Sequence, residues 1–438
     1  MKVLAIGYYD DFARFFLGVK KEFKRETSTI EFRYHSLYFS GALYFWIRGH
    51  EASWCSMIIY IRGLLSREGY KKKLDSSKIY KGIDLEGVIN YHIICNGTRY
   101  KPALLLQAIA AIDYWEKKLE HNKPDVLILS GDSRMVIEIL NILAVRLGIK
   151  IYYFEQGPFG TTILDTEGVN TNATIRKKEI AVNAELNLAG LILQFLQRER
   201  SQKYKRSPIY RGSDFILQTL LSSVGFMPSD IFVAPNSTSK SIVYEDIRIE
   251  AETKSSEITF FLLILQVPVD VNMVYHSPDY SNHHDIVNGV YKALPANSKL
   301  VIREHPLFKG RYEDNLYNFI KAHNIPIDNE TALNVQLQMA DVVIVNNSTV
   351  GVEAIALYKP VVVLGNAYYD RPELCIKPHS NLSAALELSR NWRPDKQKVD
   401  EFLYYFFYNY LIDGHFRDEN LKGSKMVANE LMDEYYSR

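Results

Sequence analysis

Short apolar runs, each followed by a loop and then by a helical pattern, recur through this sequence and constrain its fold more than any other feature. They lie at residues 2–6, 126–130, 150–154, 258–266, 300–303, 342–345 and 361–365. Strands that alternate with helices predict parallel sheets in an α/β architecture. The clearest unit covers residues 341–365, where two apolar runs flank a helical stretch, which predicts a compact βαβ arrangement.

The length and polarity of the chain predict more than one core. With 438 residues, 47% of them hydrophobic, the chain can build two or three cores. A polar region of about residues 198–256 separates the two halves, although residues 215–224 within it look helical. We therefore predict an N-terminal domain over residues 1–254 and a C-terminal domain over residues 255–438.

Charge and cysteine content disfavour several functional classes. A net charge of +1 lacks the basic excess of a nucleic-acid-binding protein. Cys55, Cys95 and Cys375 are odd in number and have no CxxC spacing, so they predict neither a disulfide framework nor a zinc site, and they fit a reducing cytoplasm. The first apolar run is too short for a signal peptide, and no run approaches the ~18 residues that cross a bilayer. Any membrane contact is therefore expected to be peripheral.

Basic side chains follow the apolar run at residues 300–303. Arg303 ends that run, and Glu304, His305 and Pro306 come directly after it. Because ligands of open α/β sheets bind at the carboxyl ends of strands, Arg303 and His305 are placed to meet an anionic group. The alternative is a plain turn in which Pro306 ends the strand.

The run at residues 342–345 leads into a polar helix start. Backbone N–H groups and the helix dipole there could hold a phosphate, and a glutamate one turn later could reach ribose hydroxyls. The residues concerned are Asn347, Ser348, Thr349, Gly351 and Glu353. Ordinary helix capping is the alternative for this segment taken alone. Together with the His305 segment, it predicts a phosphate site of the nucleotide-sugar type.

An aspartate follows the most apolar of the runs. Gln266 ends that run and Asp270 comes four residues later. A buried strand would thus deliver a carboxylate to the mouth of the second domain, as a nucleophile or a general base. A solvated loop aspartate or a helix N-cap is the alternative.

Polar and aromatic residues also follow strands of the first half. Glu155 comes directly after the run at 150–154 and before a glycine-rich turn, Asp132 follows the run at 126–130, and Tyr8 and Tyr9 follow the first run. The 30 Tyr, 21 Phe and 4 Trp of the chain suit sugar-binding clefts and membrane-facing surfaces as well as cores. The aromatic run at 402–410 predicts a C-terminal helix packed against a domain.

At these residues the sequence resembles the capsular polysaccharide transferases that build the β-linked Kdo (3-deoxy-manno-octulosonate) linker, and related Kdo transferases of lipopolysaccharide assembly. The order and spacing of several blocks carry the resemblance, since no block is specific alone. The blocks are Glu155-Gln156-Gly157 through Thr166-Glu167-Gly168-Val169-Asn170, Leu265-Gln266-Val267 with Asp270, Glu304-His305-Pro306-Leu307, Asn347 to Ala354 with Lys359-Pro360-Val361 and Gly365 to Asp370, and Ile412-Asp413-Gly414 with Phe416.

The resemblance implies a GT-B fold, in which two Rossmann-like domains face each other across a cleft and C-terminal helices pack back. It implies CMP-β-Kdo as the donor substrate, held mostly by the C-terminal domain, with no metal and no other cofactor. It also implies that Asp270 attacks the anomeric carbon, so that Kdo passes through a covalent intermediate to a glycan or glycolipid acceptor with retention of configuration.

The resemblance also distributes the binding residues. Glu155 is carried over as a base or as an acceptor-positioning residue. The expected donor contacts are Gln266, Arg303, His305, Pro306, Asn347, Ser348, Thr349, Gly351 and Glu353. The expected acceptor contacts are Tyr8, Tyr9, Asp132 and Arg176, with the aromatic segment 38–46 as a further sugar-stacking or lipid-facing candidate.

One departure and two alternatives remain open at this stage. Many family members have an arginine after the glutamate motif, whereas here Gly157 precedes Pro158, so Arg176 or Arg303 could replace it in binding the Kdo carboxylate. The enzyme alternative is a GT-B protein that uses another nucleotide sugar, such as CMP-sialic acid or a UDP-sugar. The other alternative is a non-catalytic carbohydrate-binding subunit of a polysaccharide assembly complex. The expected location is the cytoplasm, at the inner face of a bacterial inner membrane.

Overall fold

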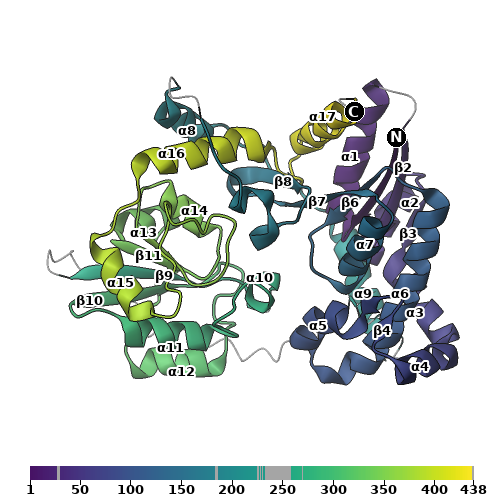
Figure 1. Ribbon diagram of the computed structural model, residues 1–438, viewed down its shortest axis with the longest axis horizontal. Helices are drawn as coiled ribbons and strands as arrows, with labels where there is room; N and C mark the ends of the chain where they lie inside the picture. Colours follow the sequence, from purple (N-terminus) through teal and green to yellow (C-terminus); the bar gives the residue numbers. More distant parts are fainter. Residues whose placement is uncertain are drawn as a thin grey trace. The chain divides into compact units, whose positions relative to one another are not determined.

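The computed structural model describes residues 1–26, 30–182, 186–223, 226, 228, 230–231, 258–268 and 270–436. The chain divides into two units, and each is considered by itself. Unit 1 comprises Met1–Val169, Leu196–Ala234 and Tyr410–Arg438, and unit 2 comprises Asn170–Phe195 and Pro235–Asn409. Both units are α/β structures built on a largely parallel sheet (Figure 1).

The sheet of unit 1 has the strand order β13-β8-β7-β6-β1-β2-β3. Its strands are β1 (Lys2–Gly7), β2 (Glu31–Ser36), β3 (Ala52–Trp54), β6 (Val126–Ser130), β7 (Lys150–Gln156), β8 (Thr161–Asp165) and β13 (Ile412–Asp413). The strands from β3 to β7 are parallel, whereas β8 is antiparallel to β7 and β13 is antiparallel to β8. The parallel part follows the Rossmann order, which reverses between β1 and β6.

Helices cover both faces of this sheet. They are α1 (Asp10–Glu26), α2 (Phe39–Ile47), α3 (Cys55–Leu65), α4 (Arg67–Ser76), α5 (Leu85–Asn96), α6 (Lys101–Asn122), α7 (Met135–Arg146), α9 (Pro208–Ser223) and α17 (Lys422–Tyr436), with a hairpin of β4 (Ile79–Tyr80) and β5 (Ile83–Asp84) beside them. Val3 and Ala5 join a core cluster with residues of α1 and α17, while Leu4 and Ile6 are buried on the opposite face. Burial on both faces explains why the strands are continuous apolar runs.

The C-terminal segment is part of unit 1. Helix α17 lies beside α1 (Figure 1), and the Ser424 hydroxyl donates a hydrogen bond to the Phe15 carbonyl at 3.1 Å. The Arg417 guanidinium forms an ion pair of 2.7 Å with the buried Asp11. The sequence prediction of a boundary at residue 254 assigned Tyr410–Arg438 to the C-terminal domain and Asn170–Phe195 to the N-terminal domain. In the structure, Tyr410–Arg438 belongs to unit 1 and Asn170–Phe195 belongs to unit 2. The position 254/255 itself lies outside the described residues.

The sheet of unit 2 has the order β10-β9-β11-β12, and all its strands are parallel. The strands are β9 (Thr259–Ile264), β10 (Ser298–Arg303), β11 (Val342–Val345) and β12 (Val361–Val363). Single parallel bridges extend the sheet, from Ile302 to Ile327 beyond β10 and from Val362 to Ile376 beyond β12. In chain order the six segments then read 3-2-1-4-5-6, the Rossmann arrangement, and the order reverses between β9 and β11.

The helices of unit 2 are on the whole shorter than those of unit 1. They are α8 (Leu188–Gln197), which continues into unit 1, α10 (Val271–Val274), α11 (His283–Ala293), α12 (Asp314–Ala322), α13 (Leu333–Met339), α14 (Val350–Ile355), α15 (Leu382–Asn391) and α16 (Lys396–Tyr405). The longest of those described in this unit is α11, with 11 residues. In Figure 1, α11 and α12 lie together on one side of the sheet. The core cluster on this side includes Leu263, Ile302 and Ile344 from three neighbouring strands.

The sequence predictions for the fold are confirmed in class and in most elements. Each of the seven apolar runs contains a strand, and the α/β class with two Rossmann-type units is the one that the GT-B expectation requires. The facing of the two units across a cleft stays a prediction. The aromatic run at 402–410 is helical, as α16 followed by the π-helical turn Phe406–Tyr410, and Phe407 stacks on Phe195 at a centroid distance of 4.2 Å.

Candidate functional site

The candidate site of unit 2 lies where its strand order reverses. The carboxyl ends of β9 and β11 are adjacent there, because the two strands pair in parallel from Phe261 with Val342 to Ile264 with Val345. Chain segments that leave adjacent parallel strands at such a point diverge to opposite faces and leave a ligand-binding crevice. Gln266 and Asp270 follow β9, and Asn347 and Ser348 follow β11.

Asp270 is half-buried and caps helix α10. Its Oδ1 accepts a hydrogen bond of 2.6 Å from the Val271 backbone N–H, and its Oδ2 accepts one of 3.3 Å from the Asn272 side chain. The N-cap alternative raised by the sequence is therefore what the structure contains. Capping leaves the Asp270 carboxylate able to make further interactions, because each of its oxygens has a second lone pair. Its role as a nucleophile stays a prediction.

His305 lies within electrostatic reach of Asp270. Burial lowers the pKa of His305, and the negative charge of Asp270 acts in the opposite direction. The His305 Nδ1 accepts a hydrogen bond of 3.3 Å from the Leu307 backbone N–H, so the neutral ring carries its proton on Nε2. His305 can thus present an N–H donor, while the adjacent Pro306 is exposed.

The two residues before His305 serve the structure of the loop. The Arg303 Nη1 donates 2.6 Å hydrogen bonds to the Thr331 carbonyl and to Gln336 Oε1. Glu304 is buried and accepts hydrogen bonds from the Tyr317 hydroxyl at 2.5 Å and from the Asn329 amide at 2.7 Å. The contacts of Glu304 hold the turn that positions His305. The Arg303 guanidinium has further N–H groups besides those used in its two hydrogen bonds. Binding of the donor substrate by Arg303 stays a prediction.

The segment after β11 enters the six-residue helix α14. Ser348 is half-buried, its Oγ accepts a hydrogen bond of 3.3 Å from the Val350 N–H, and Thr349 is exposed without a side-chain capping bond. Glu353 is half-buried on α14; burial raises the pKa of Tyr368, and the charge of Glu353 raises it further. The predicted segment therefore lies at the reversal point, with Thr349 exposed.

Gly351 is required by packing. A Cβ atom at Gly351 would overlap the hydroxyl of the fully buried Tyr369, which donates a hydrogen bond to the Ser348 carbonyl. We expect Gly351→Ala to lower the free energy of unfolding by about 1–3 kcal/mol, because Tyr369 must move and loosen the Ser348 turn. Urea denaturation measures this change. The control is Gly212→Ala in α9, where no atom lies within 4 Å, and which should stabilise by about 0.5–1 kcal/mol. Equal effects of the two substitutions would contradict the packing role.

Two buried amide side chains at this edge have polar atoms without a hydrogen-bond partner in the described part of the chain. Gln266 is 7% exposed, and neither its Oε1 nor its Nε2 has a hydrogen-bond partner there; the Asn347 Oδ1 has none either. The Asn347 Nδ2 donates hydrogen bonds to the Asn272 carbonyl at 2.9 Å and to the His276 carbonyl at 3.0 Å, which fixes the amide. Since an unsatisfied buried amide costs about 1–3 kcal/mol, these groups are suited to a polar ligand that presents both donors and acceptors.

The corresponding edge of unit 1 brings together Tyr8, Asp132 and Glu155. A Cβ atom at Gly131, which has φ +78°, would lie 3.7 Å from the Tyr8 hydroxyl and 3.8 Å from Glu155 Oε2. Burial raises the pKa of Tyr8 to about 12, with Glu155, Tyr9 and Asp132 adding to the rise and Arg134 opposing it. The Asp132 oxygens accept hydrogen bonds from the Ser133 hydroxyl at 2.5 Å and from the Val169 N–H at 3.0 Å. Three predicted site residues therefore share the β1/β6 reversal point.

Arg134 and Tyr91 were not among the predicted site residues. Arg134 follows the Ser130-Gly131-Asp132 segment, so its position after β6 was the available signal. Tyr91 comes from α5 and contacts Arg134, which lies far from it in the sequence, so no local pattern could indicate that Tyr91 belongs to this site. Arg134 lies over the rings of Tyr8 and Tyr91, at 4.9 and 5.6 Å from their centroids.

Arg176 lies in unit 2, although it was predicted as an acceptor contact of the N-terminal domain. Its guanidinium binds both oxygens of Asp370, with Nε to Oδ1 at 2.8 Å and Nη2 to Oδ2 at 3.0 Å. Asp370 is also 3.5 Å from the Lys377 ammonium. The two parallel N–H groups that could bind a sugar carboxylate are thus already bound to Asp370. In this structure Arg176 forms an ion pair within unit 2.

His92 packs beneath the start of α7 and predicts a pH effect. Burial, aided by Arg134, lowers its pKa from 6.5 to about 3, and its Nε2 accepts a 3.4 Å hydrogen bond from the Met135 N–H. Below pH ~6.5 His92 is protonated in the unfolded chain but stays neutral in the folded chain. The free energy of unfolding therefore falls as the pH falls, by up to about 1.4 kcal/mol per pH unit. We expect His92→Gln to show a shallower loss between pH 5.5 and 4.5 in urea denaturation. An unchanged slope, or the same change in the exposed-site control His121→Gln, would contradict this.

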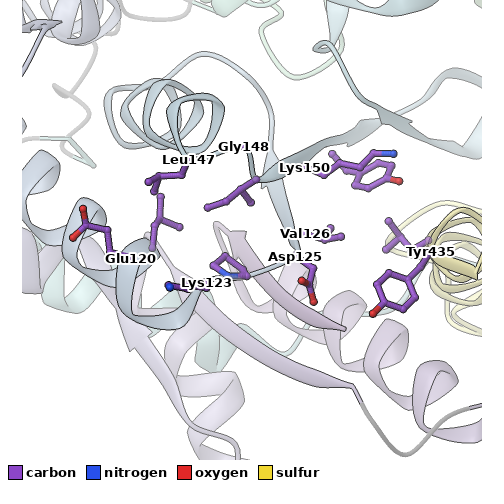
Figure 2. A pocket seen from close by; sticks show the side chains of 13 residues that line it. Glu120, Lys123, Asp125, Val126, Leu147, Gly148, Lys150 and Tyr435 are labelled. Atoms are coloured by element: carbon purple, nitrogen blue, oxygen red, sulfur yellow. The ribbon is translucent and has the colours of Figure 1, made fainter. Parts of the chain in front are cut away.

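A cavity of about 500 Å³ lies at the opposite edge of the unit 1 sheet (Figure 2). Asp125 and Lys150, at the starts of β6 and β7, line it together with Glu120 of α6 and Tyr435 of α17. None of the predicted site residues contributes to its wall. It is therefore separate from the strand carboxyl ends at which Rossmann-type sheets bind ligands.

The described residues contain neither a membrane-spanning helix nor a metal-ligand cluster. Within them, no helix has the length and apolarity to cross a membrane. No group of three or more His, Cys, Asp or Glu in that part of the chain could hold a metal ion. The absence of a metal requirement stays a prediction.

The fold and these two edges define a class, namely a protein of two Rossmann-type units with polar ligand-binding edges. The family model described as "Capsule polysaccharide biosynthesis protein" matches residues 125–417. The chain therefore belongs to the capsule polysaccharide biosynthesis protein family, which confirms the predicted resemblance at the family level.

Individual relatives match to different extents. Protein FixF of Sinorhizobium fredii is 34% identical over 166 residues, covering 36% of this chain and only 40% of FixF. The capsule polysaccharide modification protein LipB of Neisseria meningitidis serogroup B is 26% identical over 357 residues, covering 72% of this chain and 80% of LipB. Among solved structures, the β-Kdo 2,7 transferase KpsC of Thermosulfurimonas dismutans aligns with 74% of this chain and 89% of its own, at 15% identity and a TM-score of 0.38.

Proposed function

We propose that this protein is a glycosyltransferase that moves Kdo from CMP-β-Kdo to a glycan or glycolipid acceptor in capsule or lipopolysaccharide synthesis. One observation carries the proposal: Asp270, the N–H donor of His305, the Gln266 amide and the Asn347 Oδ1, the last two without a partner among the described residues, follow the adjacent parallel strands β9, β10 and β11 at one edge of the unit 2 sheet. A carboxylate, a phosphate-binding donor and amides suited to a base edge are what a retaining transfer from a CMP-sugar requires.

In the proposed first step, the Asp270 carboxylate attacks the anomeric carbon of Kdo. The bond from that carbon to the phosphate oxygen breaks, and CMP leaves with the electron pair. The transition state has oxocarbenium character, which a neighbouring carboxylate stabilises. The His305 Nε2–H donates to the departing phosphate, with the helix start at Ser348 and Thr349 as a second source of donors.

In the proposed second step, an acceptor hydroxyl attacks the same carbon and releases the Asp270 carboxylate. The hydroxyl proton passes to a general base, for which we propose Glu155. Two successive inversions give net retention of configuration. The Glu155 Oε1 accepts a hydrogen bond of 2.8 Å from the Gln156 N–H, and Oε2 lies on the side of Tyr8 and Gly131.

Two other functions remain as outcomes of the test. A transferase or epimerase for another nucleotide sugar would use the same edge of unit 2 with a different donor. A non-catalytic carbohydrate-binding subunit would keep Asp270 only as the N-cap of α10. We place the protein in the cytoplasm with peripheral contact at the inner membrane, because the acceptor of a capsule linker is proposed to be a glycan or glycolipid there.

The experiment that tests the proposed function is trapping of the intermediate. The full chain is incubated with CMP-Kdo made in situ from Kdo and CTP by a CMP-Kdo synthetase, and intact-protein mass spectrometry detects an adduct of one Kdo. CMP-sialic acid and a UDP-sugar are parallel donors. An adduct from CMP-Kdo alone supports the proposal, an adduct from another donor favours the enzyme alternative, and no adduct together with no effect of CMP on the melting temperature would favour the non-catalytic alternative.

A further inference from the structure

An arginine at the ligand-binding edge of unit 1 contacts tyrosine rings and forms no ion pair with a carboxylate of the described residues. We define the Arg134 cluster as Arg134 with Tyr8, Tyr9, Tyr38 and Tyr91. Tyr8 and Tyr9 follow β1 and Arg134 follows β6, so these residues meet at the reversal point of the sheet, whereas Tyr38 comes from the loop after β2 and Tyr91 from α5. Four separate chain segments thus converge on one guanidinium.

Ring contacts hold the cluster together. The Tyr9 and Tyr38 rings are 4.4 Å apart between centroids, and the Tyr8 ring is 6.4 Å from that of Tyr38. The guanidinium carbon lies 4.9 Å from the Tyr8 centroid, and both Arg134 and Tyr9 act on the pKa of the buried Tyr38, which burial raises. These contacts restrict the orientation of the arginine, so its remaining N–H groups are pre-organised.

The charge of Arg134 lacks a direct counterion. In the described part of the chain no carboxylate forms an ion pair with Arg134, although both nearby arginines of the same edge have one. Those are Arg206, paired with Asp10 at 2.6 Å, and Arg211, paired with Asp214 at 3.2 Å. The Asp132 oxygens accept from Ser133 and Val169, and Glu155 Oε1 accepts from Gln156. Partial burial of an unpaired guanidinium costs free energy that a bound anion would recover.

We propose that the Arg134 cluster is an anion subsite that binds an oxyanion of the acceptor, while the tyrosine rings contact the adjoining sugar or glycerol carbons. This inference rests on the proposed function and deepens it by naming the chemistry of the acceptor. A planar guanidinium binds a carboxylate or a phosphate through two parallel N–H···O bonds, and both ligands fit that chemistry. The oxyanion comes either from a sugar-acid carboxylate at a glycan end or from a phosphodiester of a glycolipid headgroup.

The role of the cluster is to orient the acceptor relative to its base. Glu155 Oε2 and the Tyr8 hydroxyl both lie near Gly131, so an acceptor anchored at Arg134 presents its neighbouring hydroxyls toward Glu155. In this arrangement Arg134 binds the charged group of the acceptor and Glu155 accepts the proton of its hydroxyl. These separate roles explain why Arg134 and Glu155 share this edge without forming an ion pair with each other. Arg134 is on this view a positioning and specificity residue.

Binding of two small probes to the full chain tests the subsite. The methyl glycoside of Kdo supplies the carboxylate, and glycerophosphoglycerol supplies the phosphodiester; isothermal titration calorimetry measures each dissociation constant. We expect one probe to bind, and we expect Arg134→Gln to weaken that binding at least about ten-fold, as for a lost hydrogen bond to a charged group. Arg134→Lys keeps the positive charge but loses the planar pair of N–H donors, so its dissociation constant should lie between those of the native chain and of Arg134→Gln. The probe that binds identifies the source of the oxyanion.

The matched control is Arg48→Gln. Arg48 also stacks on a tyrosine, 3.5 Å from the Tyr44 centroid, and donates to the Tyr210 hydroxyl at 3.0 Å, but it lies at the end of α2 away from the strand edge. Its loss should leave probe binding unchanged. If neither probe binds the native chain, or if Arg134→Gln and Arg134→Lys both bind as tightly as the native chain, the subsite is disproved. Intermediate trapping on Asp270 fails or succeeds independently, so the two proposals are separable.

Discussion

We expect Asp270→Ala to reduce the rate of sugar transfer from CMP-Kdo by at least about a thousand-fold, because the residue that forms the covalent bond is lost. Asp270→Asn should have nearly the same effect on transfer, since an amide is a poor nucleophile. The asparagine still accepts the 2.6 Å hydrogen bond from the Val271 N–H, so α10 keeps its cap. Product formation is measured by chromatography, and CMP binding, which should persist, by the melting temperature.

The matched control for this prediction is Asp395→Asn. Asp395 caps α16, and its Oδ1 accepts hydrogen bonds from Gln397 N at 2.9 Å and Lys398 N at 3.3 Å, so it resembles Asp270 in its capping role. Asparagine caps a helix about as well as aspartate does, so Asp395→Asn should change stability little and should not alter transfer. Retained turnover in either Asp270 variant would remove this residue from the nucleophile role, and equal loss in Asp395→Asn would attribute the effect to stability.

The largest effect on stability is expected from Phe154→Ala. Phe154 is fully buried in β7, and its ring packs 4.6 Å from that of Phe15 and 5.7 Å from that of Phe416. Removing it leaves a cavity between α1, the sheet and the C-terminal segment, which should lower the free energy of unfolding by about 3–5 kcal/mol. Urea denaturation of the full chain, followed by circular dichroism, measures the change.

The control for the core prediction is Phe215→Ala in α9. Phe215 is 72% exposed, so its removal creates no cavity and should change the free energy of unfolding by less than about 0.5 kcal/mol. If Phe154→Ala were as mild as Phe215→Ala, the sheet of unit 1 would not depend on the contact between β7 and the C-terminal segment. The same comparison tests the assignment of Tyr410–Arg438 to unit 1.

Local sequence pattern predicted which residues lie at strand ends better than it predicted the division of the chain. Asp270, His305 and Asn347 come within four residues of the ends of apolar runs, and parallel pairing puts the ends of such runs at one edge of a sheet. The prediction of a linear boundary had no such support. Residues 410–438 join unit 1 through contacts such as that of Arg417 with Asp11, which span almost the whole chain and leave no local signal.

The strands that the sequence analysis left out have a similar explanation. β2 (Glu31–Ser36) alternates charged and apolar residues with the sequence EFRYHS, and β3 (Ala52–Trp54) has three residues, so neither forms an apolar run. They lie at one side of the sheet, where β2 pairs with β1 and β3 pairs with β2. Pairing with a neighbouring strand stabilises such segments more than their own composition does.

The sequence by itself determined the α/β class, most of the strands and the polar residues that follow them, because side-chain periodicity and strand ends are local properties of the chain. Tertiary structure alone decided the order of the strands, the exchange of segments between the units and the Arg134 cluster. Tyr91 reaches Arg134 from α5, and Tyr38 reaches it from the loop after β2. Such meetings depend on which strands pair and how helices cover them, and the free energy of that packing is distributed over contacts between residues far apart in the chain.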